Sequence, residues 1–271
     1  APWVRAESFP NRPIRIVIEF PPGGGIDIVA RLIVPKLSET LGQSVIIDNK
    51  AGANGVLAMD MVAKSPPDGH TIFACTTGVF AIQPFLYSKL PYDPEKGFTH
   101  ITQTGTLPYI VVTHPSLRAK NIRELITFAK ARPGALNYAS TSLGAGNHVA
   151  AELFNSMAGV KIVRINYKAM SAGFTDVVSG QVQVFFPSAN SATPYVKSGR
   201  LRALAVTSAE PSALYPDLPT VAEAGVPGYQ VDLWFGVMAP AASSAAEYRE
   251  TARAMSWFSS SHVVGAPMAS L

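Results

Sequence analysis

The segment spanning residues 14–36, IRIVIEFPPGGGIDIVARLIVPK, constrains the fold more than any other stretch of this chain. Residues 14–20 are rich in β-branched and aromatic side chains, a pattern typical of a buried strand. Two prolines and three glycines then end the strand, and apolar residues recur at helical spacing from Ile28 onward. A helix that starts directly after such a turn presents free backbone N–H groups and a positive dipole end. The segment therefore predicts an anion-binding loop.

The composition of this loop narrows the kind of anion. The loop lacks the Lys-Ser/Thr pair that ends a phosphate loop, and it does not match the dinucleotide pattern G-x-G-x-x-G. Three adjacent glycines without a lysine suit a carboxylate held by backbone N–H groups better than a triphosphate. Two alternatives stay open, namely a tight turn without a ligand and a structural role for Asp27 as a helix cap.

Strand–turn–helix units recur along most of the chain. This alternation favours parallel sheets covered by helices on both faces. Polar glycine turns follow strands in both halves, at residues 22–27 and again at 140–148. Ligands bind beyond the carboxyl ends of the strands in such sheets, and two facing lobes form a cleft. We therefore expect a small-molecule site between two α/β lobes.

Four segments carry more specific expectations. Residues 101–112 form an apolar extended run, and residues 115–132 have the spacing of one amphipathic helix. Residues 167–173 are expected to form a polar turn. Residues 187–194 are expected to form a loop, followed by a short helix at 195–198.

Bulk properties exclude several classes of protein. With 271 residues, 48% of them hydrophobic and 15% charged, the chain suits a compact globule. The net charge is +4 and the basic residues are scattered, so we expect no nucleic-acid partner. No apolar run is long enough to span a bilayer, and residues 1–10 contain no signal-peptide core. The single cysteine, Cys75, excludes an internal disulfide and is expected to be a small buried residue.

The sequence also argues against catalysis. There is no G-x-S-x-G elbow, and no carboxylate stands in an orienting position beside Ser140, Ser142 and His148. The five histidines lack metal-binding spacing. We therefore expect no catalytic residue, no metal and no cofactor. His148 has two open interpretations, as a hydrogen-bond donor to a ligand or as a surface or capping residue.

Six blocks of the chain resemble one protein family. They are NRPIRIVIEFPPGGGIDIVARLIVPKLSETLGQSVIIDNKAGANG, PPDGHTIFACTTGVFAIQPFLYSKLPYDPEKGFTHI, PGALNYASTSLGAGNHVAAELFNSMAGV, INYKAMSAGFTDVVSGQVQVFF, GRLRALAVTSAEPSALYPDLPTVAEAG and GYQVDLWFGVMAPA. Together they cover residues 9–241 in register. They resemble the Bug family, the extracytoplasmic solute receptors of tripartite tricarboxylate transporters, which is expanded in Bordetella-like bacteria.

The resemblance implies a fold and a function. The fold is an α/β, two-lobed periplasmic-binding-protein (Venus flytrap, type II) fold, each lobe a mostly parallel sheet flanked by helices. Lobe one would hold residues 9–105 plus 225–271, and lobe two residues 106–224. The protein would be a monomeric periplasmic receptor that captures a small carboxylate (an organic acid, a dicarboxylate or an acidic amino acid) for membrane transporter subunits. A sensor for a membrane signalling partner is an alternative, and an enzyme on the same scaffold is a weaker one.

The resemblance also nominates ligand-binding residues in four turns. These are Phe20, Gly24, Gly25 and Asp27 in the first loop; Thr76, Thr77 and Gly78 after the third strand; Ser140, Thr141, Gly144 and His148 in the second-lobe loop; and Tyr167 and Ser171 in the following turn.

Three departures from the family pattern qualify these expectations. Met170 places a bulky side chain near the expected pocket. Phe186 and Pro187 stand where many members have an aspartate, which favours a plain carboxylate over a ligand with a protonated amine. The chain after Ala241 bears little likeness to the family, through truncation, a frameshifted reading or divergence. If the usual helices are missing there, a face of the lobe-one sheet should be uncovered, with marginal stability or association as the result.

Overall fold

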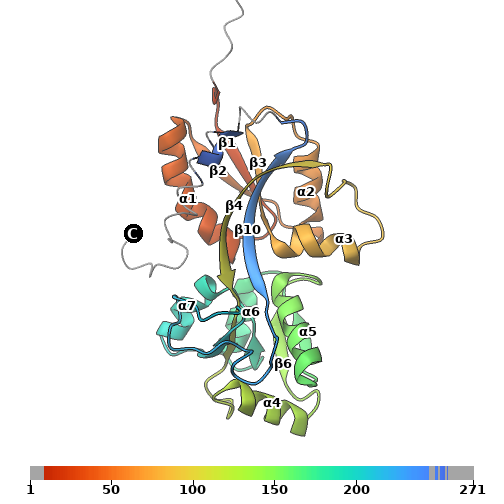
Figure 1. Ribbon diagram of the computed structural model, residues 1–271, viewed down its shortest axis with the longest axis vertical. Helices are drawn as coiled ribbons and strands as arrows, with labels where there is room; N and C mark the ends of the chain where they lie inside the picture. Colours follow the sequence, from red (N-terminus) through yellow and green to blue (C-terminus); the bar gives the residue numbers. More distant parts are fainter. Residues whose placement is uncertain (1–8, 244–247, 250, 254, 256–271) are drawn as a thin grey trace, which may run out of the picture.

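The computed structural model describes residues 9–243, 248–249, 251–253 and 255. The chain forms two lobes that lie one above the other along the long axis (Figure 1). Each lobe contains a five-stranded sheet with helices on its faces. The predicted two-lobed α/β fold is therefore confirmed. Within the described chain, no helix combines the length and the apolarity needed to cross a membrane.

Lobe one has the strand order β2-β1-β3-β10-β4. Its strands are β1 (Ile14–Ile18), β2 (Val45–Asn49), β3 (Thr71–Thr76), β4 (Phe98–Pro108) and β10 (Asp232–Pro240). Strand β1 is parallel to both neighbours, whereas β10 is antiparallel to β3 and β4. The helical segments are α1 (Gly25–Leu41), η1 (Ala53–Gly55), α2 (Val56–Ala63), η2 (Gly78–Ile82) and α3 (Gln83–Leu86).

The alternation of side chains along β1 explains how lobe one is layered. Ile14, Ile16 and Ile18 are buried in the same apolar cluster as α1, whereas Val17 is buried in the cluster that contains α2. A strand that is apolar on both faces requires a helix on each side. The glycine turn follows β1 directly, so the start of α1 lies at the carboxyl edge of the sheet.

Lobe two has the strand order β7-β6-β8-β5-β9. Its strands are β5 (Ile110–Thr113), β6 (Asn137–Ser140), β7 (Val163–Asn166), β8 (Val184–Phe185) and β9 (Arg202–Val206). Strand β5 is antiparallel to its two neighbours, while β6 is parallel to β7 and β8. The helices are α4 (Ile122–Ala131), α5 (Gly146–Ala158), α6 (Met170–Val178) and α7 (Ala189–Lys197).

The chain passes between the lobes twice. The apolar run at 101–112 is divided at Tyr109, because β4 belongs to the lobe-one sheet and β5 to the lobe-two sheet. On the return, Tyr229 still packs on lobe two, where its hydroxyl donates to the Ala150 carbonyl at 2.8 Å. Strand β10 then re-enters the first sheet. We therefore propose lobe boundaries at residues 108/109 and 231/232.

Three local elements differ from the sequence-based expectations. The helix expected at 115–132 begins only at Ile122, because the Asn121 side chain caps it by accepting from the Glu124 N–H at 2.9 Å. The turn expected at 167–173 becomes helical at Met170, the first residue of α6. Residues 189–194 of the loop expected at 187–194 belong to α7, since the complete burial of Ala189 and Ala192 outweighs the unfavourable Pro194.

Most of the divergent C-terminal segment lies outside the described residues. Of the residues that are described there, Tyr248, Thr251 and Met255 are buried. Tyr248 and Met255 belong to the apolar cluster that contains α1, and Met255 adjoins Ile33. This part of the segment therefore covers lobe one beside α1.

Candidate functional site

A cavity of about 70 Å³ lies between the two lobes. Its lobe-one wall consists of Phe20, Pro21, Gly24, Gly25, Ile26, Thr76, Leu233 and Phe235. Its lobe-two wall consists of Tyr109, Thr141, Ala145, Gly146, Asn147, Lys168, Ala169, Met170 and Ser188. Both sheets thus contribute the turns at their carboxyl ends, as expected for a ligand site in an α/β protein.

Four helices begin at this cavity. The residues that precede α1, α5, α6 and α7 are Gly24, Ala145, Ala169 and Ser188, and all four line it. Among the described residues, none of these helix starts has a side-chain cap, whereas α4, at the far end of lobe two, is capped by Asn121 (Figure 1). At each start the N–H groups of the first two helical residues donate to no described residue, whereas the His148 and Ser191 N–H groups donate back to the Ala145 and Ser188 carbonyls. The cavity therefore collects free donors and positive dipole ends.

The rest of the wall is mainly apolar. Aromatic and aliphatic side chains, including Phe20, Leu233 and Phe235, form much of it. Lys168 is the one charged side chain among the described lining residues, and none of these residues is an aspartate or a glutamate. The cavity therefore favours an anion with an apolar body and offers no carboxylate to a cationic group.

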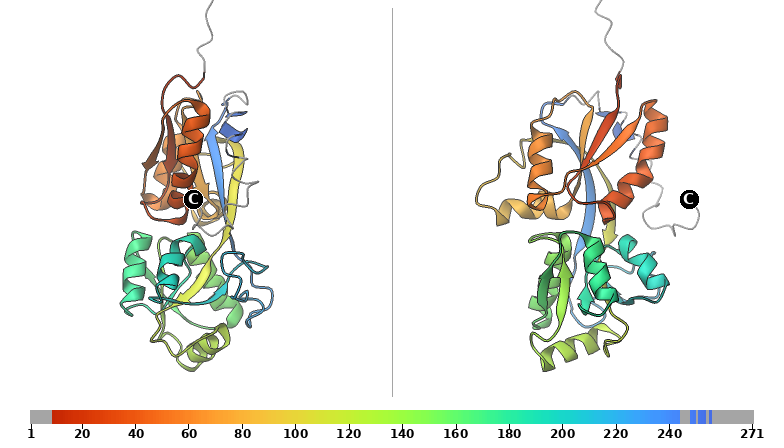
Figure 2. Two further views of the ribbon diagram at one scale, coloured as in Figure 1. Left: turned by 90° about the vertical axis from the view of Figure 1, so that its left-hand side faces the viewer. Right: turned by 180° about the vertical axis from the view of Figure 1, so that it is seen from behind.

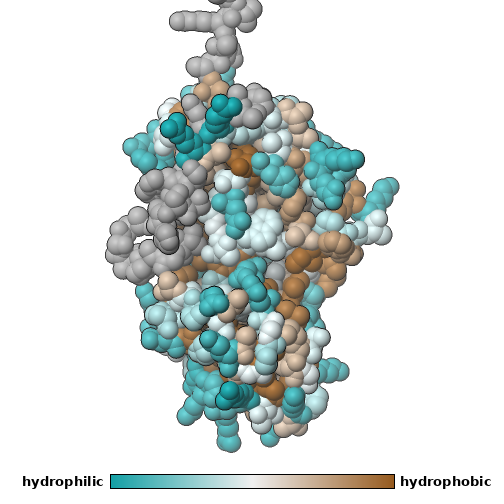
Figure 3. All heavy atoms as spheres, in the orientation of Figure 1, coloured by the Kyte–Doolittle hydropathy of each residue, from teal (hydrophilic) through white to brown (hydrophobic). Residues whose placement is uncertain are grey.

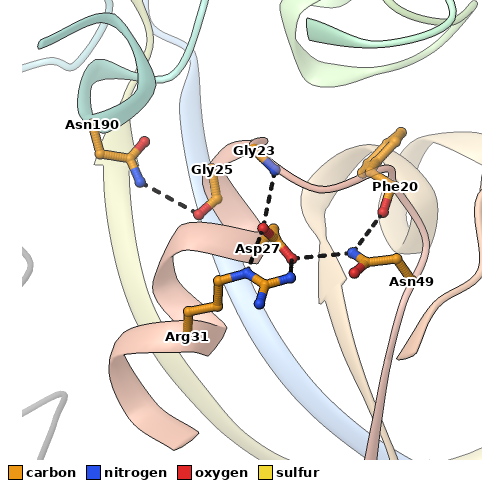
Figure 4. Close-up of polar contacts among 7 residues, drawn as sticks. All are labelled: Phe20, Gly23, Gly25, Asp27, Arg31, Asn49 and Asn190. Carbon is orange, nitrogen blue, oxygen red and sulfur yellow. Dashed lines mark hydrogen bonds and ion pairs between the residues drawn. The ribbon is translucent and has the colours of Figure 1, made fainter. Parts of the chain in front are cut away.

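Asp27 shapes the first loop instead of lining the cavity. Its Oδ2 accepts from the Gly23 N–H at 3.0 Å and from Arg31 Nε at 2.9 Å, and its Oδ1 accepts from Asn49 Nδ2 at 3.1 Å (Figure 4). Asn49 also donates to the Phe20 carbonyl at 3.0 Å. Gly23 has φ of 90°, a conformation that favours glycine. Burial alone would raise the pKa of Asp27, but the hydrogen bonds from Arg31, Gly23 and Asn49 outweigh it and lower this pKa.

Asp27→Asn should therefore lower the free energy of unfolding by about 1–3 kcal/mol at pH 7, because buried hydrogen bonds to a carboxylate are lost. The Arg31 side chain is 54% exposed, so its ion pair contributes little. The difference in free energy of unfolding between Asp27→Asn and wild type should shrink as the pH falls through the lowered pKa of Asp27, because the wild-type carboxylate then becomes neutral as well. Urea denaturation checks this, with the exposed Asp217→Asn as control; equal stability of the two variants would contradict the assignment.

Of the other residues nominated in lobe one, four line the cavity and two do not. Phe20, Gly24, Gly25 and Thr76 line the cavity. Thr77 holds the start of β10, since its hydroxyl accepts from the Trp234 N–H at 3.0 Å. Gly78 faces the other lobe, where a Cβ atom would lie 3.0 Å from the Gly144 carbonyl oxygen.

Of the residues nominated in the second-lobe loop, Thr141 lines the cavity. Its hydroxyl donates to Asn147 Oδ1 at 3.3 Å, and Asn147 Nδ2 lies 3.4 Å from the Met170 sulfur. Ser140 is buried and accepts from Arg164 Nε at 3.2 Å. These contacts hold the starts of α5 and α6 together along the wall.

His148 caps the same loop instead of facing the cavity. Its Nδ1 accepts from the Gly144 N–H at 3.1 Å, which places the ring proton on Nε2. Burial, and then the nearby Arg164, lowers the pKa of His148, so the ring is neutral. Of the two interpretations left open by the sequence, the contacts favour the capping role.

The remaining nominated residues lie at the margins of the site. The Tyr167 hydroxyl donates to Asp176 Oδ2 at 2.7 Å, away from the cavity lining. Ser171 is exposed as the second residue of α6. Gly144 has φ of 78°, and a side chain there would overlap Leu86 of lobe one.

The lobes touch on both sides of the cavity. On the α7 side, Asn190 Nδ2 donates to the Gly25 carbonyl at 3.3 Å (Figure 4). On the α3 side, Asn54 Nδ2 donates to the Leu143 carbonyl at 2.5 Å. Apolar residues gather at the level where the lobes meet (Figure 3). These contacts join the two lobes on both sides of the cavity, and both views in Figure 2 show the lobes next to one another along the long axis.

Sequence reasoning missed several lining residues, including Tyr109, Lys168, Ser188, Leu233 and Phe235. Ser188 lies in a segment that was expected to be an unstructured loop, and Tyr109 lies inside an apolar run. Strand β10 is more than a hundred residues from β3 in the chain, and no local pattern indicates that they pair. The order Lys168-Ala169-Met170 after β7 does carry a signal, because the resemblance places Met170 near the pocket and Lys168 is only two residues before it.

Comparison with known proteins adds a family match. The sequence-family model described as the tripartite tricarboxylate transporter family receptor matches residues 29–260. A UPF0065 protein from the tcbD–tcbE intergenic region of Pseudomonas sp. strain P51 is 40% identical over 237 residues, which cover 87% of this chain and 70% of that protein. BugT of Bordetella pertussis is 36% identical over 238 residues, which cover 88% of this chain and 73% of BugT.

Solved structures are similar over almost the same span. A Rhodopseudomonas palustris protein with adipate has a TM-score of 0.88 and 36% identity, covering 91% of this chain and 83% of that one. MatC from the same organism, with bound malate, has a TM-score of 0.86 and 30% identity, covering 92% and 85%. The periplasmic binding protein BugD has a TM-score of 0.86 and 30% identity, covering 92% and 83%.

Proposed function

Because this chain belongs to the tripartite tricarboxylate transporter family receptors, we propose that it captures a small organic acid between its lobes. The members of this family and the structural neighbours are solute-binding proteins and not enzymes. The observation that carries the proposal is the convergence of four uncapped helix starts on one cavity. Free N–H groups and aligned dipoles suit a carboxylate whose negative charge is delocalised over two oxygens.

The lining narrows the ligand class. Adipate and malate, found in the two Rhodopseudomonas neighbours, are dicarboxylates without an amine. Here Phe20, Leu233 and Phe235 would contact an apolar body, and Lys168 would add positive charge for a second carboxylate. A protonated amine would meet no acidic residue among the described lining residues. Phe186, one of the two residues that stand where the resemblance indicates an aspartate in many members, is fully buried in the core. We therefore propose an organic acid or dicarboxylate over an acidic amino acid.

Capture follows from the division of the site between the lobes. The α1 start belongs to lobe one, while the starts of α5, α6 and α7 belong to lobe two. Neither lobe alone surrounds the ligand, so an acid that contacts both walls binds the closed form more tightly than the open form. By likeness to the family and to the periplasmic BugD, the closed receptor would deliver its ligand from the periplasm to membrane transporter subunits.

Titration calorimetry tests the proposal. The protein is first unfolded, dialysed and refolded to remove any co-purified ligand. We expect binding of at least one of adipate, malate and benzoate, and no binding of adipamide, which has the shape of adipate without its charges. Aspartate and glutamate should bind more weakly. Tight binding of these two amino acids without a response to the simple acids would overturn the ligand class, and binding of adipamide equal to that of adipate would overturn the anion site.

A further inference from the structure

Tyr109 occupies the point where the chain first crosses between the lobes. It follows β4 of lobe one and precedes β5 of lobe two. Its carbonyl oxygen accepts from the Thr207 N–H at 3.0 Å and from the Thr207 hydroxyl at 3.0 Å. Because Thr207 directly follows β9 of lobe two, these bonds fix the Tyr109 backbone to lobe two at the point where the chain crosses.

The side chain of Tyr109 reaches from this crossing point into the cavity wall. It is only 5% exposed and is part of the cavity lining. Its hydroxyl lies over the first residue of α5, because a Cβ atom on Gly146 would overlap the Tyr109 Oη atom. Only a glycine at that position leaves room for the phenol. The hydroxyl therefore lies beside the free N–H groups at the start of α5.

Among the described residues, none forms a hydrogen bond with this hydroxyl, and its oxygen is open to the cavity instead of being enclosed by protein. Buried polar groups in native proteins are nearly always paired, so an unpaired hydroxyl on the wall of a cavity indicates a partner inside it. Burial raises the pKa of Tyr109, which keeps the phenol protonated. A protonated phenol donates strongly to a carboxylate oxygen.

We propose that Tyr109 is a ligand-binding residue whose hydroxyl donates a hydrogen bond to a carboxylate oxygen of the bound acid, beside the start of α5. The inference rests on the proposed function and assigns one group of that site. It also gives this crossing point a direct contact with the ligand, because the residue that makes the contact is the residue at which the chain changes lobes.

Tyr109→Phe tests the assignment, since it removes the hydroxyl and keeps the ring. The acid that binds the wild-type protein most tightly among adipate, malate and benzoate is used as the probe. We expect its affinity to fall about 10- to 100-fold, as for a hydrogen bond to a charged group. The melting temperature of the ligand-free variant should stay equal to that of wild type or rise, because the hydroxyl has no protein partner.

Tyr229→Phe is the matched control. Tyr229 is equally buried, but its hydroxyl donates to the Ala150 carbonyl inside lobe two. This variant should melt at a lower temperature and keep its affinity within about twofold, since an unpaired carbonyl costs stability without touching the ligand.

The outcomes separate the two proposals. If wild type binds an acid and Tyr109→Phe binds it equally well, the role of Tyr109 is overturned while the receptor function stands. If ligand-free Tyr109→Phe is destabilised as much as Tyr229→Phe, the hydroxyl has a structural partner and the assignment is also overturned. If no acid in the panel binds wild type, both proposals fail.

Discussion

Replacing Gly25 with alanine should weaken acid binding roughly 10- to 100-fold, because the added methyl group would keep the lobes from closing. A Cβ atom on Gly25 would lie 2.7 Å from Ser188 Oγ, 3.2 Å from Ser188 Cβ and 3.3 Å from Asn190 Oδ1. Ser188 is buried at the start of α7, so it has little room to move. In an open form these atoms separate, and the alanine would fit without strain.

Two measurements check this expectation. Calorimetry should show the loss of affinity, and small-angle X-ray scattering should show that the variant no longer becomes more compact when the acid is added. Gly24→Ala is the control for compaction in the same turn, because a Cβ atom there has Pro21 O, at 4.0 Å, as its nearest neighbour and meets no residue of lobe two. It should still become more compact when the acid is added. A Gly25→Ala protein that still binds and compacts like wild type would show that the contact between α1 and α7 does not limit closure.

Glu19→Gln should stabilise the protein by about 3 kcal/mol at pH 8. Glu19 follows β1 and is only 1% exposed. Its Oε1 accepts from the Thr76 N–H at 3.0 Å, and its Oε2 is buried without a partner among the described residues. Burial raises the pKa of Glu19 from 4.5 to about 7. Burial, and then the charge of Glu19, raises the pKa of the neighbouring Cys75. A glutamine keeps the acceptor for Thr76 and carries no charge to bury.

The sign of the pH dependence follows from the raised pKa. The folded state holds the Glu19 proton more tightly than the unfolded state, so this contribution to stability is fully present below pH 4.5. It is lost as the pH rises through about 7, at a cost of about 3 kcal/mol for a shift of this size. Above pH 7 the wild-type protein should therefore melt roughly 6–12 °C below Glu19→Gln, and near pH 4.5 the two should nearly coincide.

Thermal melts between pH 4 and pH 9 check this expectation. The difference between the two proteins is the informative quantity, because carboxylates with lowered pKa values, such as Asp27, titrate equally in both. Exposed Glu210→Gln serves as the control and should follow wild type throughout. A constant difference between Glu19→Gln and wild type across this range would show that Glu19 stays ionised in the folded state.

Local patterns predicted the turns that surround the cavity, but not which side chains enter it. The glycines after β1 and the turn after β6 carry signals within a few residues, and both border the cavity. The direction of Asp27 depends instead on Asn49, which lies 22 residues away at the end of the neighbouring strand. Asp27 can shape the loop because β1 pairs with β2 and thereby brings Asn49 beside it. No short pattern in the first loop indicates this pairing.

Local patterns also failed to predict part of the lobe-two wall of the cavity, for a different reason. Prolines and small polar residues at 187–194 are typical of a loop, and tertiary packing of Ala189 and Ala192 overrode that preference to form α7. Because the sequence predicts a helix here only at 195–198, the start of α7 at Ala189 is absent from the prediction, and with it one of the four converging helix starts. Tyr109 was hidden because an apolar run does not show where a chain leaves one sheet for another.

The convergence of four helix starts also affects the empty protein. Each N-terminus carries roughly half a positive elementary charge, and closure brings these partial charges to the edge of one cavity of about 70 Å³. Like charges repel, and an apolar lining with no acidic residue among the described ones screens them poorly. A closed receptor without an anion is therefore under electrostatic self-repulsion. In the function we propose, the bound acid would be the counter-ion that removes this repulsion, and its presence would shift the balance between open and closed forms toward the closed one.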